Sequence, residues 1–108
     1  MLAAKAASDL QADDIVILDL KKLTSFTDYF VICGGRSDRQ VRSIAEAVEK
    51  NLKEQGIHPL GVEGEGEGHW VLMDYGSVVV HVFYHEVREY YSLEKLWSDA
   101  ETVCTKNL

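Results

Sequence analysis

The sequence predicts an α/β protein in which a mixed β-sheet of about five strands is flanked by helices. Runs of β-branched and aromatic residues recur along the chain, an amphipathic helix follows the second run, and a glycine-containing turn joins two later runs into a hairpin. With 108 residues, 46% hydrophobic and 27% charged, the chain has the size and composition of a soluble globular protein, which excludes a disordered or fibrous class. We expect a single domain over residues 1–108, with its core over about residues 5–97.

The chain begins with a short helix, predicted over residues 2–10. Small and apolar residues repeat there at helical spacing, at Leu2, Ala3, Ala6, Ala7 and Leu10. The acidic pair Asp13-Asp14 is expected to end this helix. Two β-rich runs follow at residues 15–20 and 29–33, and they predict neighbouring strands separated by a polar connection.

The main helix is predicted over residues 37–55. Ser37-Asp38-Arg39-Gln40 has the S-x-x-Q form of a capping box, in which the serine oxygen accepts an N–H of the first turn and the glutamine reaches back. Apolar residues then fall on one stripe, at Val41, Ile44, Ala45, Val48 and Leu52. The Gly-Glu repeat of residues 61–68 shows no apolar periodicity and predicts a mobile acidic loop.

Residues 70–75 and 78–83 flank Gly76-Ser77, and glycine at the first central position favours a type II′ hairpin. One side of this hairpin is wholly apolar and is expected in the core: Val71, Met73, Tyr75, Val78, Val80 and Val82. The other side is chemically mixed: Trp70, Leu72, Asp74, Val79, His81 and Phe83. Two short helices are predicted beyond it, over residues 87–91 and 93–100, with Ser92 as a cap between them, and the last residues are expected to fray.

The charge balance is acidic, with 11 Lys and Arg against 18 Asp and Glu and a net charge of −7. This charge opposes binding to a phosphate backbone, so direct sequence-specific nucleic-acid binding is not expected and a basic protein partner is favoured. Cys33, in an apolar run, and Cys104 form no disulfide framework. No apolar segment approaches the ~20 residues of a membrane span, and the N-terminus lacks a signal peptide's features. A cytoplasmic protein is expected.

Candidate sites for chemistry are few, and we expect no catalytic residue, no cofactor and no metal. Gly34-Gly35-Arg36-Ser37 lies between a strand and a capped helix, as phosphate-binding turns do, but it lacks their spacing, so a tight strand-to-helix turn is favoured. Nucleotidyl transfer needs two or three carboxylates on rigid strands to hold metal ions, and that group is missing. His81 and His85 have no further ligand at zinc-site spacing, and Cys33 has no signature of an activated thiol.

The mixed side of the hairpin is the candidate surface for binding a partner protein. Trp70 and Phe83 lie side by side across the hairpin, and we interpret them either as core under a covering helix or as anchors of an interface, where tryptophan is a preferred hot-spot residue. Asp74 would pair with an Arg or Lys of the partner. The expected contact residues are Trp70, Leu72, Asp74, His81 and Phe83.

Several blocks of the sequence occur together in a fixed order. They are Asp28-Tyr29-Phe30-Val31-Ile32-Cys33, Ser37-Asp38-Arg39-Gln40-Val41, Val62-Glu63-Gly64-Glu65, Trp70-Val71-Leu72-Met73-Asp74-Tyr75-Gly76, Val78-Val79-Val80-His81-Val82-Phe83 and Leu93-Glu94-Lys95-Leu96-Trp97. With these blocks the chain closely resembles the ribosomal silencing factor family, RsfS, also called Iojap-like. Two positions depart from the family's pattern: Gly34, where a threonine is usual, and Ser77, where an aspartate commonly follows the hairpin glycine.

The resemblance implies a factor that binds the large ribosomal subunit through the universal ribosomal protein uL14. It would thereby block joining of the small subunit and repress translation when nutrients are scarce. The resemblance also implies a fold like that of a nucleotidyltransferase, a mixed sheet with helices, but without the catalytic acids. Members of the family often form homodimers. The alternative interpretation is a nucleotide-binding or nucleotidyltransferase-type enzyme that uses the Gly34-Gly35-Ser37 turn.

Overall fold

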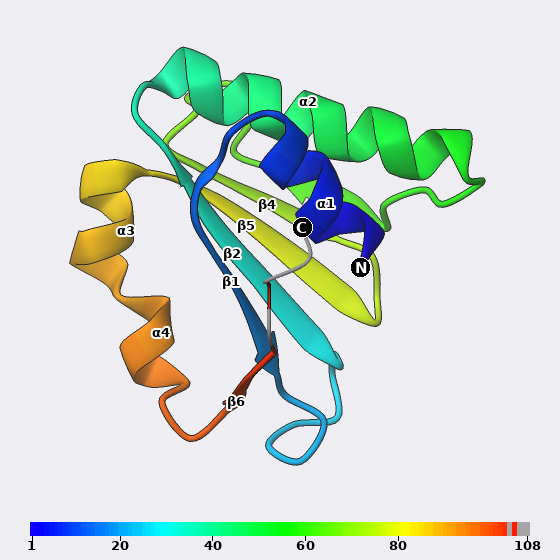
Figure 1. Cartoon of the computed structure of the whole chain (residues 1–108), viewed down its shortest axis with the longest axis vertical. Coiled ribbons are helices and arrows are strands. Elements are labelled where there is room, and N and C mark those ends of the chain that lie inside the picture. Colours follow the sequence, from blue (N-terminus) through cyan, green and yellow to red (C-terminus); the bar gives the residue numbers. More distant parts are fainter. Residues whose placement is uncertain (104, 106–108) are drawn as a thin grey trace.

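A computed structural model describes residues 1–103 and 105 of the chain. The elements follow in the order α1 (Leu2–Asp9), β1 (Asp13–Asp19), β2 (Tyr29–Gly35), α2 (Asp38–Glu54), β3 (Gly61–Glu63), β4 (Trp70–Asp74), β5 (Val78–Tyr84), α3 (His85–Tyr91), α4 (Leu93–Leu96) and β6 (Glu101–Val103) (Figure 1). The α/β class predicted from the sequence is confirmed. Cys104, for which no disulfide was expected, lies outside the described residues.

The six strands form one mixed sheet in the order β3-β4-β5-β2-β1-β6. Neighbouring strands are antiparallel except for β2 and β5, which run parallel. A parallel pair needs a crossover connection, and the segment that contains α2, β3 and β4 supplies it. The mixed sheet is therefore confirmed, with six strands in the described part of the chain where about five were expected.

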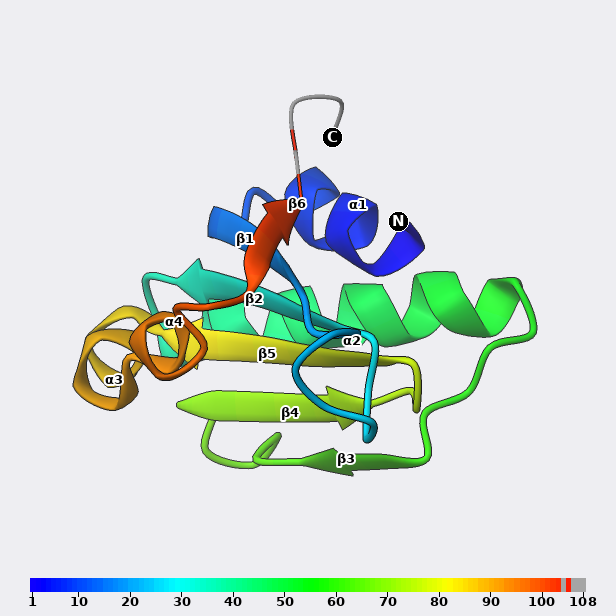
Figure 2. The same ribbon diagram turned by 90° about the horizontal axis from the view of Figure 1, so that it is seen from below.

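The two faces of the sheet carry separate apolar cores. The larger core lies between the sheet and the helices α1 and α2, and it contains the strand residues Val31, Val71, Met73, Val80 and Val82. The smaller core lies on the opposite face, at Leu18, Leu20, Phe30, Ile32, Val79 and Phe83. Figure 1 and Figure 2 show α3 and α4 well apart from α1 and α2. The hairpin side predicted to be wholly apolar is confirmed as part of the larger core.

Ser37 caps α2 as predicted. Its Oγ accepts the Gln40 N–H at 3.0 Å, and the Gln40 side chain reaches back to accept the Arg36 N–H at 2.7 Å. All five residues of the predicted stripe are buried: Val41, Ile44, Ala45, Val48 and Leu52. Burying one large aliphatic side chain contributes about 1.5–3 kcal/mol, against about 1 kcal/mol for a cap. The stripe is therefore what chiefly holds α2 on the sheet.

The β4–β5 hairpin has the predicted register, in which Met73 pairs with Val80. The Tyr75 N–H donates to the Val78 carbonyl at 2.9 Å and closes the two-residue turn. Gly76 has a φ of 82°, as the first central position of a type II′ turn requires. This register decides which hairpin side chains face which core.

The predicted N-terminal helix is confirmed and the alanines of its stripe are buried, but the leucines of the stripe are not. Ala4 is fully buried, whereas Leu2 and Leu10 are exposed. The buried face is made entirely of alanines, because small side chains allow α1 to approach its neighbours closely. The helix also ends before the pair Asp13-Asp14, which opens β1 instead of ending α1.

The Gly-Glu segment is more regular than the predicted mobile loop. Its first residues form β3, in which Val62 pairs with Met73 of β4 and packs on the larger core. The Gly68 N–H donates to the Gly64 carbonyl at 3.1 Å, so a turn connects β3 to β4. One apolar residue among glycines and glutamates was too little to reveal a strand by periodicity.

The C-terminal part also differs from its prediction. α3 begins two residues early, at His85, and α4 ends at Leu96 rather than at residue 100. Ser92 lies between the helices, but its hydroxyl donates to the Glu89 carbonyl at 2.6 Å and does not cap α4. Residues 101–103 form β6, which pairs with β1, and Val103 packs on the larger core. The fraying expected for the last residues falls largely outside the described residues.

Candidate protein-binding surface

The candidate surface lies along β4, on the sheet face opposite α1 and α2. Because side chains alternate along a strand, Trp70, Leu72 and Asp74 share this face, and each is half-buried. Glu63 of β3 is paired with Leu72, so the exposed carboxylate of Glu63 stands on the same face. We call these four residues the β4 surface. It combines an aromatic ring, an aliphatic side chain and two carboxylates.

Trp70 is held in one orientation by three contacts. Its indole N–H donates to Nδ1 of His81 at 3.1 Å. The centroid of its ring lies 4.9 Å from that of Phe83 on β5 and 4.9 Å from that of Tyr91 on α3. Aromatic pairs of this kind add about 0.5–1.5 kcal/mol each beyond burial. The half-exposed indole is therefore pre-organised.

His81 and Phe83 do not stand where direct contact with a partner requires them. They are only 3% and 0% exposed. Both residues belong to the central strand β5. The smaller core around them is covered by Val87 of α3, Leu93 of α4 and Trp97, which directly follows α4. The structure thus corrects the expectation for these two residues: they support Trp70 from the interior.

Asp74 has a structural role beside its place on the β4 surface. Its Oδ1 accepts the Gly76 N–H at 2.8 Å and so stabilises the β4–β5 turn. Asparagine at this position would keep the acceptor and remove the charge. Asp74→Asn therefore separates the turn contact from an ionic contact with a partner.

Three aromatic residues near this surface were not assigned to it from the sequence. Tyr91 is 52% exposed and covers one side of Trp70. Phe26, in the β1–β2 connection, is 61% exposed, and its ring lies 6.2 Å from that of Trp97, which also contacts the buried Phe30 at 5.7 Å. Helical spacing placed Tyr91 and Trp97 on helices, but only the tertiary fold brings them to this face.

The stability of the protein should depend on the protonation of His81. Burial lowers the pKa of His81 from 6.5 to about 4. The unfolded chain therefore binds a proton as the pH falls below about 6.5 while the folded state does not, so stability is lost between about pH 6.5 and pH 4, by on the order of 3 kcal/mol. We expect urea unfolding free energies to decline from pH 7.5 to pH 5, and His81→Gln to remove most of the decline. An equal decline in that variant would assign the effect to other groups.

Gly64 fixes the chain next to Trp70. It has a φ of 86°, and a Cβ at this position would overlap the Trp70 carbonyl oxygen. Gly64→Ala should lower the free energy of unfolding by about 1–3 kcal/mol, the usual cost of a strained backbone, because the turn or the start of β4 must shift. Thermal unfolding measures this loss. Gly66→Ala is the matched control, since a Cβ there meets no atom within 4 Å; equal losses in both variants would contradict the assigned contact.

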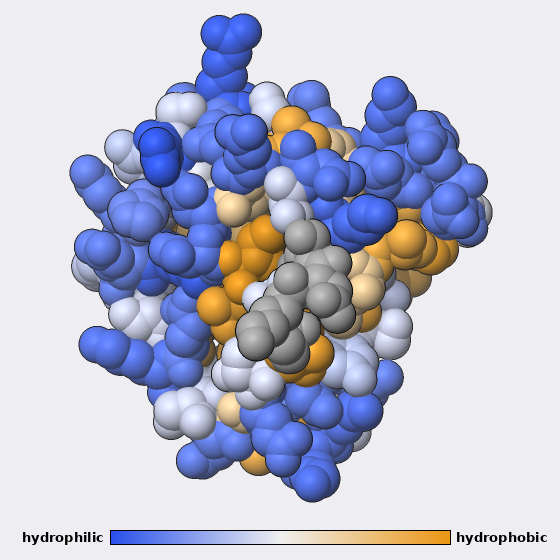
Figure 3. All heavy atoms as spheres, viewed as in Figure 1, coloured by the Kyte–Doolittle hydropathy of each residue, from blue (hydrophilic) through white to orange (hydrophobic). Residues whose placement is uncertain are grey.

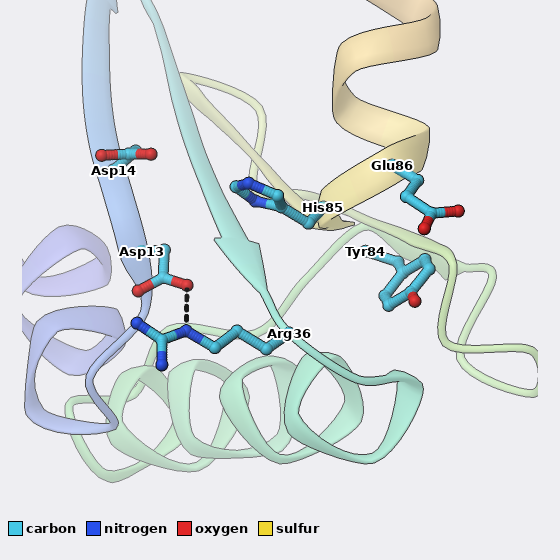
Figure 4. Close-up of a pocket in the computed structure, with 6 residues that line it drawn as sticks. All are labelled: Asp13, Asp14, Arg36, Tyr84, His85 and Glu86. Atoms are coloured by element: carbon cyan, nitrogen blue, oxygen red, sulfur yellow. Dashed lines mark hydrogen bonds and ion pairs between the residues drawn. The ribbon is translucent and has the colours of Figure 1, made fainter.

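A polar cleft of about 530 Å³ lies at the carboxyl ends of the parallel strands β2 and β5. It is lined by Asp13, Asp14, Arg36, Tyr84, His85 and Glu86 (Figure 4). Figure 4 shows the Arg36 side chain turned to Asp13, where Nε lies 3.1 Å from Oδ2. Three of the six lining residues are acidic, and the cleft's arginine is already paired, so the lining opposes a phosphate.

The glycine turn beside this cleft is explained by packing. A Cβ on Gly35 would lie 2.9 Å from Cγ2 of Val41, so the close approach of β2 to α2 requires glycine. Two N–H groups at the start of α2 are already bonded, those of Arg39 and Gln40, at 2.9 and 3.0 Å. These contacts favour the tight turn over a nucleotide site. Calorimetry with ATP, CTP and Mg²⁺ tests the nucleotide alternative, and we expect no binding heat.

Other candidate sites give no indication of chemistry. Burial raises the pKa of the Cys33 thiol to about 12, so this cysteine is not an activated nucleophile. Within residues 1–103 and 105, no three His, Cys, Asp or Glu side chains gather as metal ligands. Over the same residues, no helix combines the length and the apolar character needed to cross a membrane.

An apolar hollow of about 210 Å³ lies between α1, the end of α2 and the β4–β5 turn. Its lining consists of Met1, Leu2, Ala3, Leu52, Ile57, Tyr75, Ser77 and Val78. In Figure 3 hydrophobic residues come to the surface beside α1, within a largely hydrophilic face. Among the described residues, the lining of the hollow includes no charged side chain, so it lacks the carboxylates that distinguish the β4 surface.

One open mixed sheet with helices on both faces, bearing an aromatic and acidic surface, defines a small acidic α/β protein. Its family follows from comparison with known proteins. The family model "Ribosomal silencing factor during starvation", RsfS, matches residues 1–108, and the chain belongs to this family. The family predicted from the sequence is confirmed.

Individual relatives agree with this assignment. The ribosomal silencing factor RsfS of Bacillus subtilis is 48% identical over 99 residues, which are 92% of this chain and 84% of that protein. A crystal structure of a Chromobacterium violaceum protein has a TM-score of 0.88 and 45% identity, covering 90% of this chain and 81% of that one. A mouse protein named "Mitochondrial assembly of ribosomal large subunit protein 1" is 36% identical over 90 residues, 81% of this chain and 40% of that protein. The likeness to a nucleotidyltransferase stays a prediction.

Proposed function

We propose that this protein binds the large ribosomal subunit through ribosomal protein uL14, blocks joining of the small subunit and represses translation when nutrients are limiting. Membership of the ribosomal silencing factor family supports the proposal, as does the mouse relative's name, which refers to the ribosomal large subunit. The main structural observation behind the proposal is the β4 surface, where half-buried Trp70 lies beside Leu72 and Asp74. We also propose that the protein acts in the cytoplasm.

Charge favours a protein surface of the ribosome over its RNA. The net charge of −7 repels phosphates, whereas ribosomal proteins are typically basic and attract an acidic partner. On the β4 surface, Asp74 and Glu63 would pair with Lys or Arg side chains around the ring of Trp70. The aromatic contact would supply affinity, and the carboxylates would select the partner.

Obstruction of the subunit interface requires no chemistry. The fold extends 34 × 33 × 27 Å, so a bound copy fills space that a closely apposed small subunit needs. Because His81 and Phe83 already fix Trp70, little side-chain entropy is lost when the ring is buried by a partner. Binding alone therefore suffices, without a cofactor or a turnover reaction.

Photo-crosslinking on purified subunits tests the proposal. A photoreactive residue at Leu72 should crosslink to uL14 on large subunits, and the same residue at Leu2, on the opposite face, should not. We expect the chain to sediment with large subunits and not with small ones, and binding to decline less steeply with salt than binding to RNA would. Crosslinks from position 72 to ribosomal RNA or to another protein would contradict the proposed partner.

We also propose that the free protein forms a homodimer, as the family resemblance implies. Size-exclusion chromatography of the free chain tests it. A dimer that Trp70→Ala dissociates would have its interface on the β4 surface, so the two copies would have to part before uL14 binds. A monomer at all concentrations would end this proposal.

A further inference from the structure

The β4 surface adjoins two helices that are weakly anchored. Within the described part of the chain, no residue of α3 or α4 is buried, yet α3 carries Tyr91 against Trp70. We propose that Arg88 is a positioning residue that holds both helices in place and so shapes the β4 surface from outside it. The inference rests on the proposed function for its biological role, but its structural part can be tested without a ribosome.

Arg88 joins three elements. Its Nε and Nη2 atoms lie 2.7 and 2.6 Å from Oε1 of Glu94 in α4. Nη2 also donates to the Asp14 carbonyl at 2.8 Å, and Nη1 donates to the Asp13 carbonyl at 3.4 Å. Only 11% of the Arg88 side chain is exposed. The guanidinium thus ties α3 and α4 to the start of β1.

The two carbonyls are available because β1 is irregular at its start. Its register against β2 shifts between Asp13 and Val16, and Asp14 has a φ of 47°. A bulge of this kind leaves backbone groups without a partner in the strand ladder, so their carbonyls can accept other donors. Arg88 supplies the missing donors and therefore compensates for the bulge.

The contacts of Arg88 reach the aromatic residues through the helices. Arg88 and Tyr91 are three residues apart in α3, so a rotation of this helix moves both. Glu94 and Trp97 have the same spacing at α4, and the Trp97 ring lies 5.7 Å from the Phe30 ring. Loss of the Arg88–Glu94 contact should therefore displace Tyr91 and Trp97 together.

The geometry requires arginine rather than lysine. The planar guanidinium has five donors and can serve a carboxylate and two carbonyls at once, whereas a lysine ammonium is a compact point charge. Removing one partner of a largely buried ion pair also leaves the other charge unpaired, so the effect exceeds that of an exposed pair. Substitutions at Arg88 and Glu94 should act alike.

NMR spectroscopy of the free chain tests the structural part. Arg88→Lys and Glu94→Gln should both shift the Trp70 indole N–H resonance, assigned with Trp70→Phe, and speed amide exchange in α3. Arg39→Lys, at an exposed arginine of α2, is the matched control and should change neither. An unchanged Trp70 resonance and unchanged α3 exchange in both folded variants would overturn the proposal.

A double-mutant cycle tests whether Arg88 acts through Tyr91. Arg88→Lys should weaken binding to large subunits about tenfold in the parent chain, but by less than about threefold in a Tyr91→Ala background, because coupled residues are not additive. Equal losses in the two backgrounds would overturn positioning through Tyr91. If the parent chain does not bind large subunits at all, the proposed function fails, while the NMR result still decides the role of Arg88.

Discussion

Replacing Trp70 with alanine is expected to release the protein from large ribosomal subunits. Truncating a central aromatic anchor costs ~2 kcal/mol or more, which is about thirtyfold in affinity. Trp70 fits that description because its half-exposed ring is fixed by His81, Phe83 and Tyr91. Titration of large subunits with the variant, followed by sedimentation, measures the loss.

Two further variants make this result specific. Trp70→Phe keeps the aromatic contacts but lacks the N–H that His81 accepts, so it should lose less affinity than Trp70→Ala. Leu2→Ala removes an exposed apolar side chain, 49% exposed, on the opposite side of the sheet and should bind normally. Circular dichroism checks that each variant is folded. If folded Trp70→Ala binds large subunits normally, Trp70 is not part of the binding site.

Replacing Phe83 with alanine is expected to destabilise the fold rather than remove a contact with the partner. Phe83 is fully buried in the smaller core, and its ring lies 4.9 Å from that of Trp70. Truncating a buried phenylalanine costs about 3–5 kcal/mol, through lost burial and the cavity that remains. Urea unfolding measures this change.

Phe26→Ala provides the matched comparison for Phe83. Phe26 is 61% exposed, and its truncation should cost about 1 kcal/mol or less, as for most surface positions. Phe83→Leu, which keeps most of the volume, should restore much of the stability lost in Phe83→Ala. A Phe83→Ala variant that is as stable as the parent but does not bind would show that Phe83 touches the partner after all.

The parts of the fold with strong local signals could be predicted from the sequence. At the start of α2, the Ser37 hydroxyl oxygen accepts the Gln40 N–H and the Gln40 side chain accepts the Arg36 N–H. Gly76 supplies the positive φ that fixes the hairpin register. The stripe of α2 and the apolar side of the hairpin have the periodicity of buried faces. These signals act over a few residues, so no tertiary information was needed.

Other features depend on contacts between distant segments. The sequence placed His81 and Phe83 beside Trp70 but could not show that α3 and α4 would cover them. Val62 forms a strand only because β4 lies beside it, and Ala4 is buried only because α1 packs through its alanines. The half-buried position of Trp70 on β4, next to edge strand β3, likewise depends on the assembled sheet, which no local pattern reveals.

Light scattering of mixed ribosomal subunits measures the proposed obstruction most directly. Protein added to large subunits before the small subunits should lower the joined fraction in proportion to its occupancy. Trp70→Ala at the same concentration should leave joining intact. Undiminished joining on large subunits that are saturated with the bound protein would contradict the account.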